Sequence, residues 1–127
     1  MSTGKVALKH VSKPWGSFDQ FTLNERSTVK ILTIKPGAST SLQSHKGRRE
    51  FWVALDNGIH IQIGNEKISL RKGSSILVKK GKEHRLRCEG RLEARILEIS
   101  FGHFSESDIV RYEDNYGRVT KMVSRKR

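Results

Sequence analysis

A glutamine, a histidine and a glutamate lie close together in the segment SLQSHKGRREFW, at positions 43, 45 and 50. Successive side chains of an extended chain point to opposite faces, so Gln43 and His45 share one face. If residues 46–49 form the tip of a hairpin, Glu50 begins the returning strand and comes back beside His45. Three side chains that can ligate a metal then converge from one hairpin.

A fourth side chain of this kind, His84, follows a second turn signal in the segment GSSILVKKGKEH. Gly73 opens an expected strand, and a turn at residues 79–81 delivers His84. Two neutral imidazoles, one carboxylate and one amide oxygen would suit Zn²⁺, Mn²⁺, Fe²⁺, Co²⁺ or Ni²⁺. The residues alone leave a second interpretation open, in which the hairpin is merely charged and solvated and His84 is a hydrogen-bonded structural residue.

The elements that must position these side chains are short strands. Segments rich in β-branched residues recur between turn signals such as Pro36-Gly37 and Gly64-Asn65. The expected strands are residues 29–35, 50–55, 59–63, 67–70, 75–79, 84–88 and 92–101. This pattern predicts an antiparallel all-β fold closed as a sandwich or barrel. One short helix is expected at residues 105–110, where Ser-Glu-Ser-Asp resembles a capping box.

Composition restricts the class of protein. A chain of 127 residues is expected to form one domain, and a formal charge of +12 favours anionic partners. The cations are scattered and do not alternate with aromatic residues, so no specific nucleic-acid binding is expected. No apolar run approaches the length of a membrane span, and the single Cys88 fits a reducing compartment. We therefore expect a cytoplasmic protein with no membrane partner.

The spacing of the ligand-type residues resembles the two motifs of the cupin family. Gly37-x5-Gln43-x-His45-x4-Glu50 resembles the first motif with its leading histidine replaced by glutamine, and Gly73-x7-Gly81-x2-His84 resembles the second. More narrowly, the chain resembles the C-terminal cupin domain of type II mannose-6-phosphate isomerases, which is often fused to a mannose-1-phosphate guanylyltransferase. The segments that carry this narrower resemblance are KPWGSF, TIKPGASTSLQSH, RREFW, LEISFG and SDIVRYEDNYGR.

The resemblance implies a jelly-roll β-barrel, also called a double-stranded β-helix, over residues 13–118. Residues 1–12 would be an N-terminal extension or first strand, and residues 119–127 a basic, flexible tail. The resemblance further implies a homodimer, because cupin sheets often pair across subunits. No Gly-rich nucleotide loop precedes the cupin motifs in this sequence, so nucleotide-sugar synthesis is not expected of it.

The family's activity is the interconversion of mannose 6-phosphate and fructose 6-phosphate through an enediol. The resemblance implies that a divalent metal ion is held by Gln43, His45, Glu50 and His84. Isomerisation also needs a base, and the sequence leaves several candidates. They are Glu98, Lys46 and a metal-bound hydroxide, with Arg118 as a further catalytic candidate.

A phosphorylated sugar also needs cations that bind its phosphate. The candidates are Arg48 beside the ligand hairpin, Lys35, and Arg118 in the family-like C-terminal segment. Trp52 either stacks on the sugar or belongs to the core.

Two features of the sequence leave other functions open. Lys46 and Gly47 stand where the family commonly has histidines, which suggests a non-catalytic cupin that binds a sugar or another metabolite. His45, Glu50 and His84 alone would also suit an Fe²⁺ oxygenase, although Gln43 argues mildly against that alternative.

Overall fold

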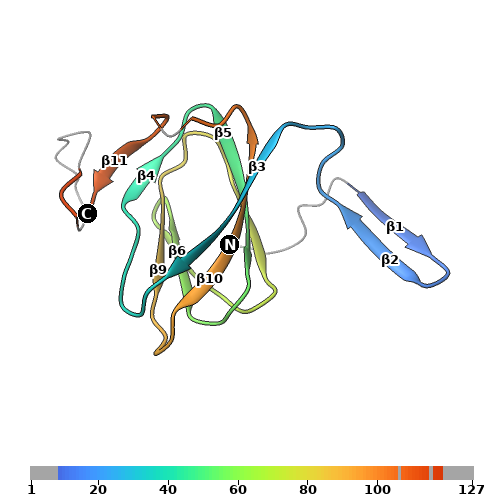
Figure 1. Cartoon of the computed structure of the whole chain (residues 1–127), viewed down its shortest axis with the longest axis horizontal. Coiled ribbons are helices and arrows are strands. Elements are labelled where there is room, and N and C mark those ends of the chain that lie inside the picture. The colour runs from blue at the N-terminus through green and yellow to red at the C-terminus, as the bar shows by residue number, and fades with distance from the viewer. Residues whose placement is uncertain (1–8, 106, 115, 119–127) are drawn as a thin grey trace.

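The computed structural model describes residues 9–105, 107–114 and 116–118, and every regular element within these ranges is a β-strand. Figure 1 shows their arrangement. The strands are β1 (Lys9–Lys13), β2 (Gly16–Gln20), β3 (Ser27–Ile34), β4 (Leu42–Ser44), β5 (Arg48–Ala54), β6 (Ile59–Ile63), β7 (Glu66–Leu70), β8 (Ser75–Val78), β9 (His84–Cys88), β10 (Ala94–Gly102) and β11 (Val110–Glu113). The expected all-β fold is confirmed.

Two antiparallel sheets form the body of the molecule. One has the strand order β3-β10-β5-β8 and the other the order β11-β4-β9-β6-β7, and they face each other in Figure 1. Most neighbouring strands are not consecutive in the sequence, as for β3 beside β10 and β4 beside β9, whereas β6 and β7 form a hairpin. Residues distant in the chain are therefore brought to the same interior.

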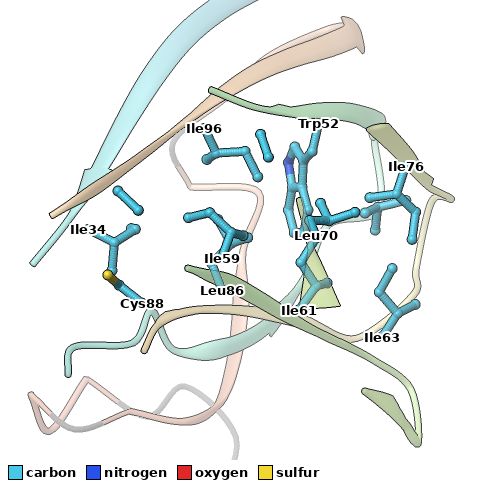
Figure 2. Packing of buried hydrophobic residues seen from close by; sticks show 13 residues of the cluster. Ile34, Trp52, Ile59, Ile61, Ile63, Leu70, Ile76, Leu86, Cys88 and Ile96 are labelled. Atoms are coloured by element: carbon cyan, nitrogen blue, oxygen red, sulfur yellow. The ribbon is translucent and has the colours of Figure 1, made fainter. Parts of the chain in front are cut away.

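The hydrophobic core fills the space between the two sheets. Alternation along β6 buries Ile59, Ile61 and Ile63 and leaves the two residues between them half-buried. Figure 2 shows these isoleucines packing with Trp52 of β5 and Leu86 of β9. Because one face of each strand is filled in this way, the register of each strand is fixed. Polar side chains on the inward-facing positions of these strands, such as Glu50 and His84, are consequently held in defined positions.

All seven strands expected from the sequence form, whereas the expected helix at residues 105–110 is wrong. In the described part of this segment, the backbone N–H of Asp108 donates to the carbonyl oxygen of Ser105 at an N···O distance of 3.0 Å, which closes a single turn. Strand β11 then begins at Val110. A helix this short has little intrinsic stability. Contacts of Asp108 with the β4–β5 hairpin, described below, replace it.

The strands β1 and β2 form a separate hairpin that projects from the two sheets in Figure 1. Its residues are mostly exposed, and Trp15 in its turn is 73% exposed. The limits proposed for the domain and for its extensions stay predictions, and the proposed tail at residues 119–127 lies outside the described residues. The described part of the chain contains no helix with the length and apolar character needed to cross a bilayer.

Candidate metal centre

Three of the four predicted metal ligands meet inside the barrel. His45 directly follows β4, Glu50 lies on β5 and His84 begins β9. One ligand atom from each residue lies within 4.8 Å of the others, and all three side chains are buried. These three residues therefore form a group that can hold a metal ion, as the sequence predicted.

Backbone carbonyls fix the orientation of both histidines. Nδ1 of His45 donates to the carbonyl oxygen of Asp108 at 2.6 Å, and Nδ1 of His84 donates to that of Lys82 at 2.9 Å. The proton is then on Nδ1 in each ring, which leaves Nε2 unprotonated and able to donate its lone pair. Nε2 of His45 lies 3.7 Å from Glu50 Oε2, and Nε2 of His84 lies 3.5 Å from Glu50 Oε1.

The electrostatics keep these imidazoles in the form that binds metals. Burial lowers the pKa of His84 from 6.5 to about 4, and burial also lowers the pKa of His45. Both rings are therefore neutral at neutral pH, as metal ligation requires.

The carboxylate of Glu50 has one oxygen engaged and one unsatisfied. Oε2 accepts hydrogen bonds from Arg48 Nε at 3.0 Å and from Ser100 Oγ at 3.5 Å. Oε1 is buried and has no hydrogen-bond partner among the described residues. A buried carboxylate oxygen without a partner is costly, and a cation between it and the two imidazoles would remove that cost. The donor set therefore fits a divalent metal ion.

Gln43, the fourth predicted ligand, lies on the same sheet face as His84. The two residues are directly opposite each other in the pairing of β4 with β9. Opposite residues of an antiparallel pair project from the same face. This placement suits the expected arrangement, and coordination by Gln43 stays a prediction.

Arg48 lies against the metal ligands. Besides its bond to Glu50, its NH2 donates to His45 Nε2 at 3.2 Å and its NH1 to the carbonyl of Ser105 at 3.1 Å. Its guanidinium carbon also lies 4.2 Å from the centre of the Phe104 ring. All three guanidinium nitrogens are thus engaged around the site, and phosphate binding by Arg48 stays a prediction.

Asp108 is a residue of the site that sequence reasoning missed. Its carboxylate accepts from the backbone N–H groups of Lys46 and Gly47 at 2.9 and 2.8 Å, while its own carbonyl holds His45. A Cβ added at Gly47 would lie 2.9 Å from Asp108 Oδ2, so a larger residue at position 47 would disturb this contact. No local pattern identifies Asp108, because its partners lie about sixty residues earlier.

Glu98 lies inside the barrel next to Trp52, its partner in the pairing of β10 with β5. Trp52 is 1% exposed, belongs to the core cluster and donates from Nε1 to Glu98 Oε2 at 3.3 Å. Burial, together with the nearby charge of Glu50, raises the pKa of Glu98 from 4.5 to about 7. A carboxyl with such a pKa exchanges a proton readily near neutral pH.

Lys30 is a second residue that the sequence analysis missed. It lies opposite Glu98 in the pairing of β3 with β10, and its ammonium lies 4.2 Å from the centre of the Phe104 ring. The strict alternation of β3, which places Lys30 on the same face as Ile34, was a signal that could have identified it.

The remaining predicted site residues lie farther out. Lys46 is exposed at the tip of the β4–β5 hairpin. Lys35 follows β3, and Arg118 is half-exposed and bound to Asp114 through Nε at 2.7 Å. Lys35 and Arg118 nevertheless line one cavity, which also contains Gln43. Their catalytic and substrate-binding roles stay predictions.

The fold resembles solved structures of cupin, or double-stranded β-helix, proteins. CapF, a capsular polysaccharide assembling protein from Staphylococcus aureus, matches with a TM-score of 0.64 and 16% identity, over 83% of this chain and 34% of CapF. A double-stranded beta-helix protein from Klebsiella pneumoniae matches with a TM-score of 0.60 and 17% identity, over 70% of this chain and 76% of that one. The molecule therefore has a cupin fold and carries a buried His-Glu-His group.

The sequence identifies the family within this class. The family model described as "Mannose-6-phosphate isomerase C-terminal" matches residues 3–114, and the chain belongs to this family. The xanthan biosynthesis protein XanB of Xanthomonas campestris is 38% identical over 87% of this chain and 24% of its own length. The mannose-1-phosphate guanylyltransferase ManC of Salmonella typhimurium is 37% identical over 87% of this chain and 23% of its own length. The chain thus spans about a quarter of the curated relatives it matches.

Proposed function

We propose that the protein is a metal-dependent isomerase that interconverts mannose 6-phosphate and fructose 6-phosphate through an enediol. The observation that supports this proposal most is the buried His45–Glu50–His84 group with an unsatisfied carboxylate oxygen, in a chain of the mannose-6-phosphate isomerase C-terminal family. His45, Glu50 and His84 would hold the ion, with Gln43 as the fourth ligand. The bound ion would supply Lewis-acid polarisation of the sugar carbonyl.

Glu98 is the base that the geometry favours. It is a carboxyl on the inner face of β10, its pKa is raised to about 7, and it is not part of the His-Glu-His group. In the proposed reaction Glu98 would take the proton from C2 of open-chain mannose 6-phosphate and return a proton to C1 of the enediol. The hydroxyl proton of O2 would pass to O1 by exchange with solvent, which completes the conversion to the ketose. Trp52 orients the carboxylate through its Nε1–H. Lys46 is exposed at the hairpin tip, which makes it a weaker candidate.

A non-catalytic sugar-binding cupin is the second candidate, and the contact of Arg48 with His45 is the observation that favours it. Its NH2 donates to the Nε2 lone pair of His45, which is the atom that would ligate the metal. If Arg48 keeps that position, metal binding is incomplete and turnover is lost. Binding of a sugar phosphate without isomerisation would be the result.

An isomerase assay separates the two candidates. Conversion of mannose 6-phosphate to fructose 6-phosphate is measured with Mn²⁺, Zn²⁺ and Co²⁺, and again after chelation. The proposal predicts turnover that disappears on chelation, returns with metal and falls by about a hundredfold or more in Glu98→Gln. Glu93→Gln, which alters an exposed carboxylate just before β10, is the matched control and should keep full activity. Stoichiometric metal without turnover would favour the binding protein.

A further inference from the structure

A basic cavity of about 380 Å³ is lined in part by Gln43, the predicted fourth metal ligand. The end of β3, the segment at residues 38–41, β4, β11 and the residues after β11 form its walls. Its lining includes three cations, Lys35, Arg111 and Arg118, together with several hydroxyl side chains. None of the described residues that line it carries a carboxylate. Such a cavity attracts an anion that accepts several hydrogen bonds.

Arg111 distinguishes this cavity from a merely basic surface. Its side chain is half-buried, and Nε is fully buried without a hydrogen-bond partner among the described residues. Burying part of a guanidinium without an acceptor is costly, and an anion in the cavity that Arg111 lines would offset that cost through its opposite charge. Arg118 differs, because Asp114 already binds its Nε and NH2 at 2.7 and 3.1 Å.

Strand register connects Arg111 to the metal centre. Arg111 is opposite Gln43 in the pairing of β11 with β4, and Gln43 is opposite His84 in the pairing of β4 with β9. The three residues therefore form one row on the same sheet face. Strands lie roughly 4.8 Å apart, so the Cα atoms of Arg111 and His84 are separated by about 10 Å. An open-chain hexose 6-phosphate carries its phosphate at the opposite end from the carbon atoms that react.

We propose that this cavity is the phosphate subsite of the enzyme, with Arg111 as the principal anchor and Lys35 beside it. The sugar in this assignment rests on the proposed function, whereas the affinity for a phosphate group rests on the cavity itself. The row from Arg111 to His84 then aligns the substrate, with its phosphate at β11 and its carbonyl end at the ligand group. The cavity, and not Arg48, distinguishes phosphorylated from free sugars.

Calorimetric titration of the full chain tests the subsite. Inorganic phosphate, mannose 6-phosphate and mannose are titrated into zinc-loaded and chelator-treated protein at physiological ionic strength, which screens non-specific binding to a chain of charge +12. We expect both phosphates to bind and mannose to bind far more weakly. Arg111→Gln should weaken phosphate binding by about tenfold or more, since a charge-assisted contact is lost. Arg71→Gln removes the same charge at an exposed position after β7 and should have little effect.

Two further comparisons keep the outcomes distinct. Arg111→Lys retains the charge but not the paired donors, and it should show an intermediate loss if Arg111→Gln folds poorly. Unchanged phosphate affinity in a folded Arg111 variant would overturn the subsite, as would equal losses in Arg111→Gln and Arg71→Gln. Arg111-dependent phosphate binding without isomerisation would support the subsite and overturn only the proposed reaction. Isomerisation by Arg111→Gln with an unchanged KM for mannose 6-phosphate would overturn the subsite and support the proposed reaction.

Discussion

At the scale of single residues, the pKa values of two buried groups, His84 and Glu98, are shifted in opposite directions. Burial lowers the pKa of His84 from 6.5 to about 4, so between these values the unfolded chain binds more protons than the folded one. The free energy of unfolding then rises with pH. The pKa of Glu98 is raised from 4.5 to about 7 by burial and by Glu50, so in that interval the folded protein binds more protons. Its contribution to the free energy of unfolding falls with pH.

The two contributions oppose each other between about pH 4.5 and 6.5, and variants should separate them. In metal-free protein, Glu98→Gln should make the rise of unfolding free energy with pH steeper, and His84→Gln should make it shallower. Each change amounts to at most about 1.4 kcal/mol per pH unit, the value for one proton. Chemical denaturation at several pH values in the presence of a chelator measures the slopes. Identical slopes in the two variants would contradict the assigned protonation states.

At the scale of elements, the segment between β10 and β11 secures the ligand hairpin through Asp108. Its carboxylate binds the N–H groups of Lys46 and Gly47, and its carbonyl binds His45. A histidine at position 47, where the family commonly has one, would carry a Cβ that lies 2.9 Å from Oδ2 of this carboxylate. The glycine and Asp108 therefore belong to one arrangement that holds a metal ligand in place.

A double-mutant cycle tests this arrangement. Gly47→Ala should cost about 1–2 kcal/mol of unfolding free energy and weaken metal binding, because Asp108 must move and lose its backbone contacts. In an Asp108→Ala background the same substitution should cost much less, since the obstructing oxygen is gone. Denaturation and metal titration of the four proteins provide the measurement. Additive effects of the two substitutions would show that positions 47 and 108 act independently.

The sequence predicted the elements that depend on local pattern. Alternation identified the strands of the core, and spacing identified His45 and Glu50 on one hairpin with His84 as their partner. Asp108 and Arg111 escaped prediction because their roles depend on the pairing of β11 with β4. Residues 105–108 resembled a helix start, yet the described residues there satisfy the distant hairpin instead. The conformation of this segment and the positions of Asp108 and Arg111 therefore depend on long-range pairing, which local propensity does not predict.

At the scale of the whole molecule, charge and exposed apolar surface act in opposite directions. The formal charge of +12 disfavours association of two copies, while Trp15 in the β1–β2 turn, Leu23 after β2 and Ile31 on β3 are exposed apolar residues. The expected homodimer should therefore become more stable as salt screens the repulsion. Sedimentation at rising ionic strength checks this expectation. A monomer at every salt concentration would contradict it.

The proposed function requires this barrel to move a proton between C2 and C1 of a sugar phosphate. The most direct measurement is mass spectrometry of fructose 6-phosphate formed from mannose 6-phosphate in D₂O by the metal-loaded protein. A base such as Glu98 exchanges its proton with solvent, so we predict a product with deuterium bound to carbon. Glu98→Gln should give little product, and chelated protein none. Recovery of unlabelled mannose 6-phosphate alone, from protein that holds stoichiometric metal and binds the sugar phosphate, would contradict the proposed isomerase.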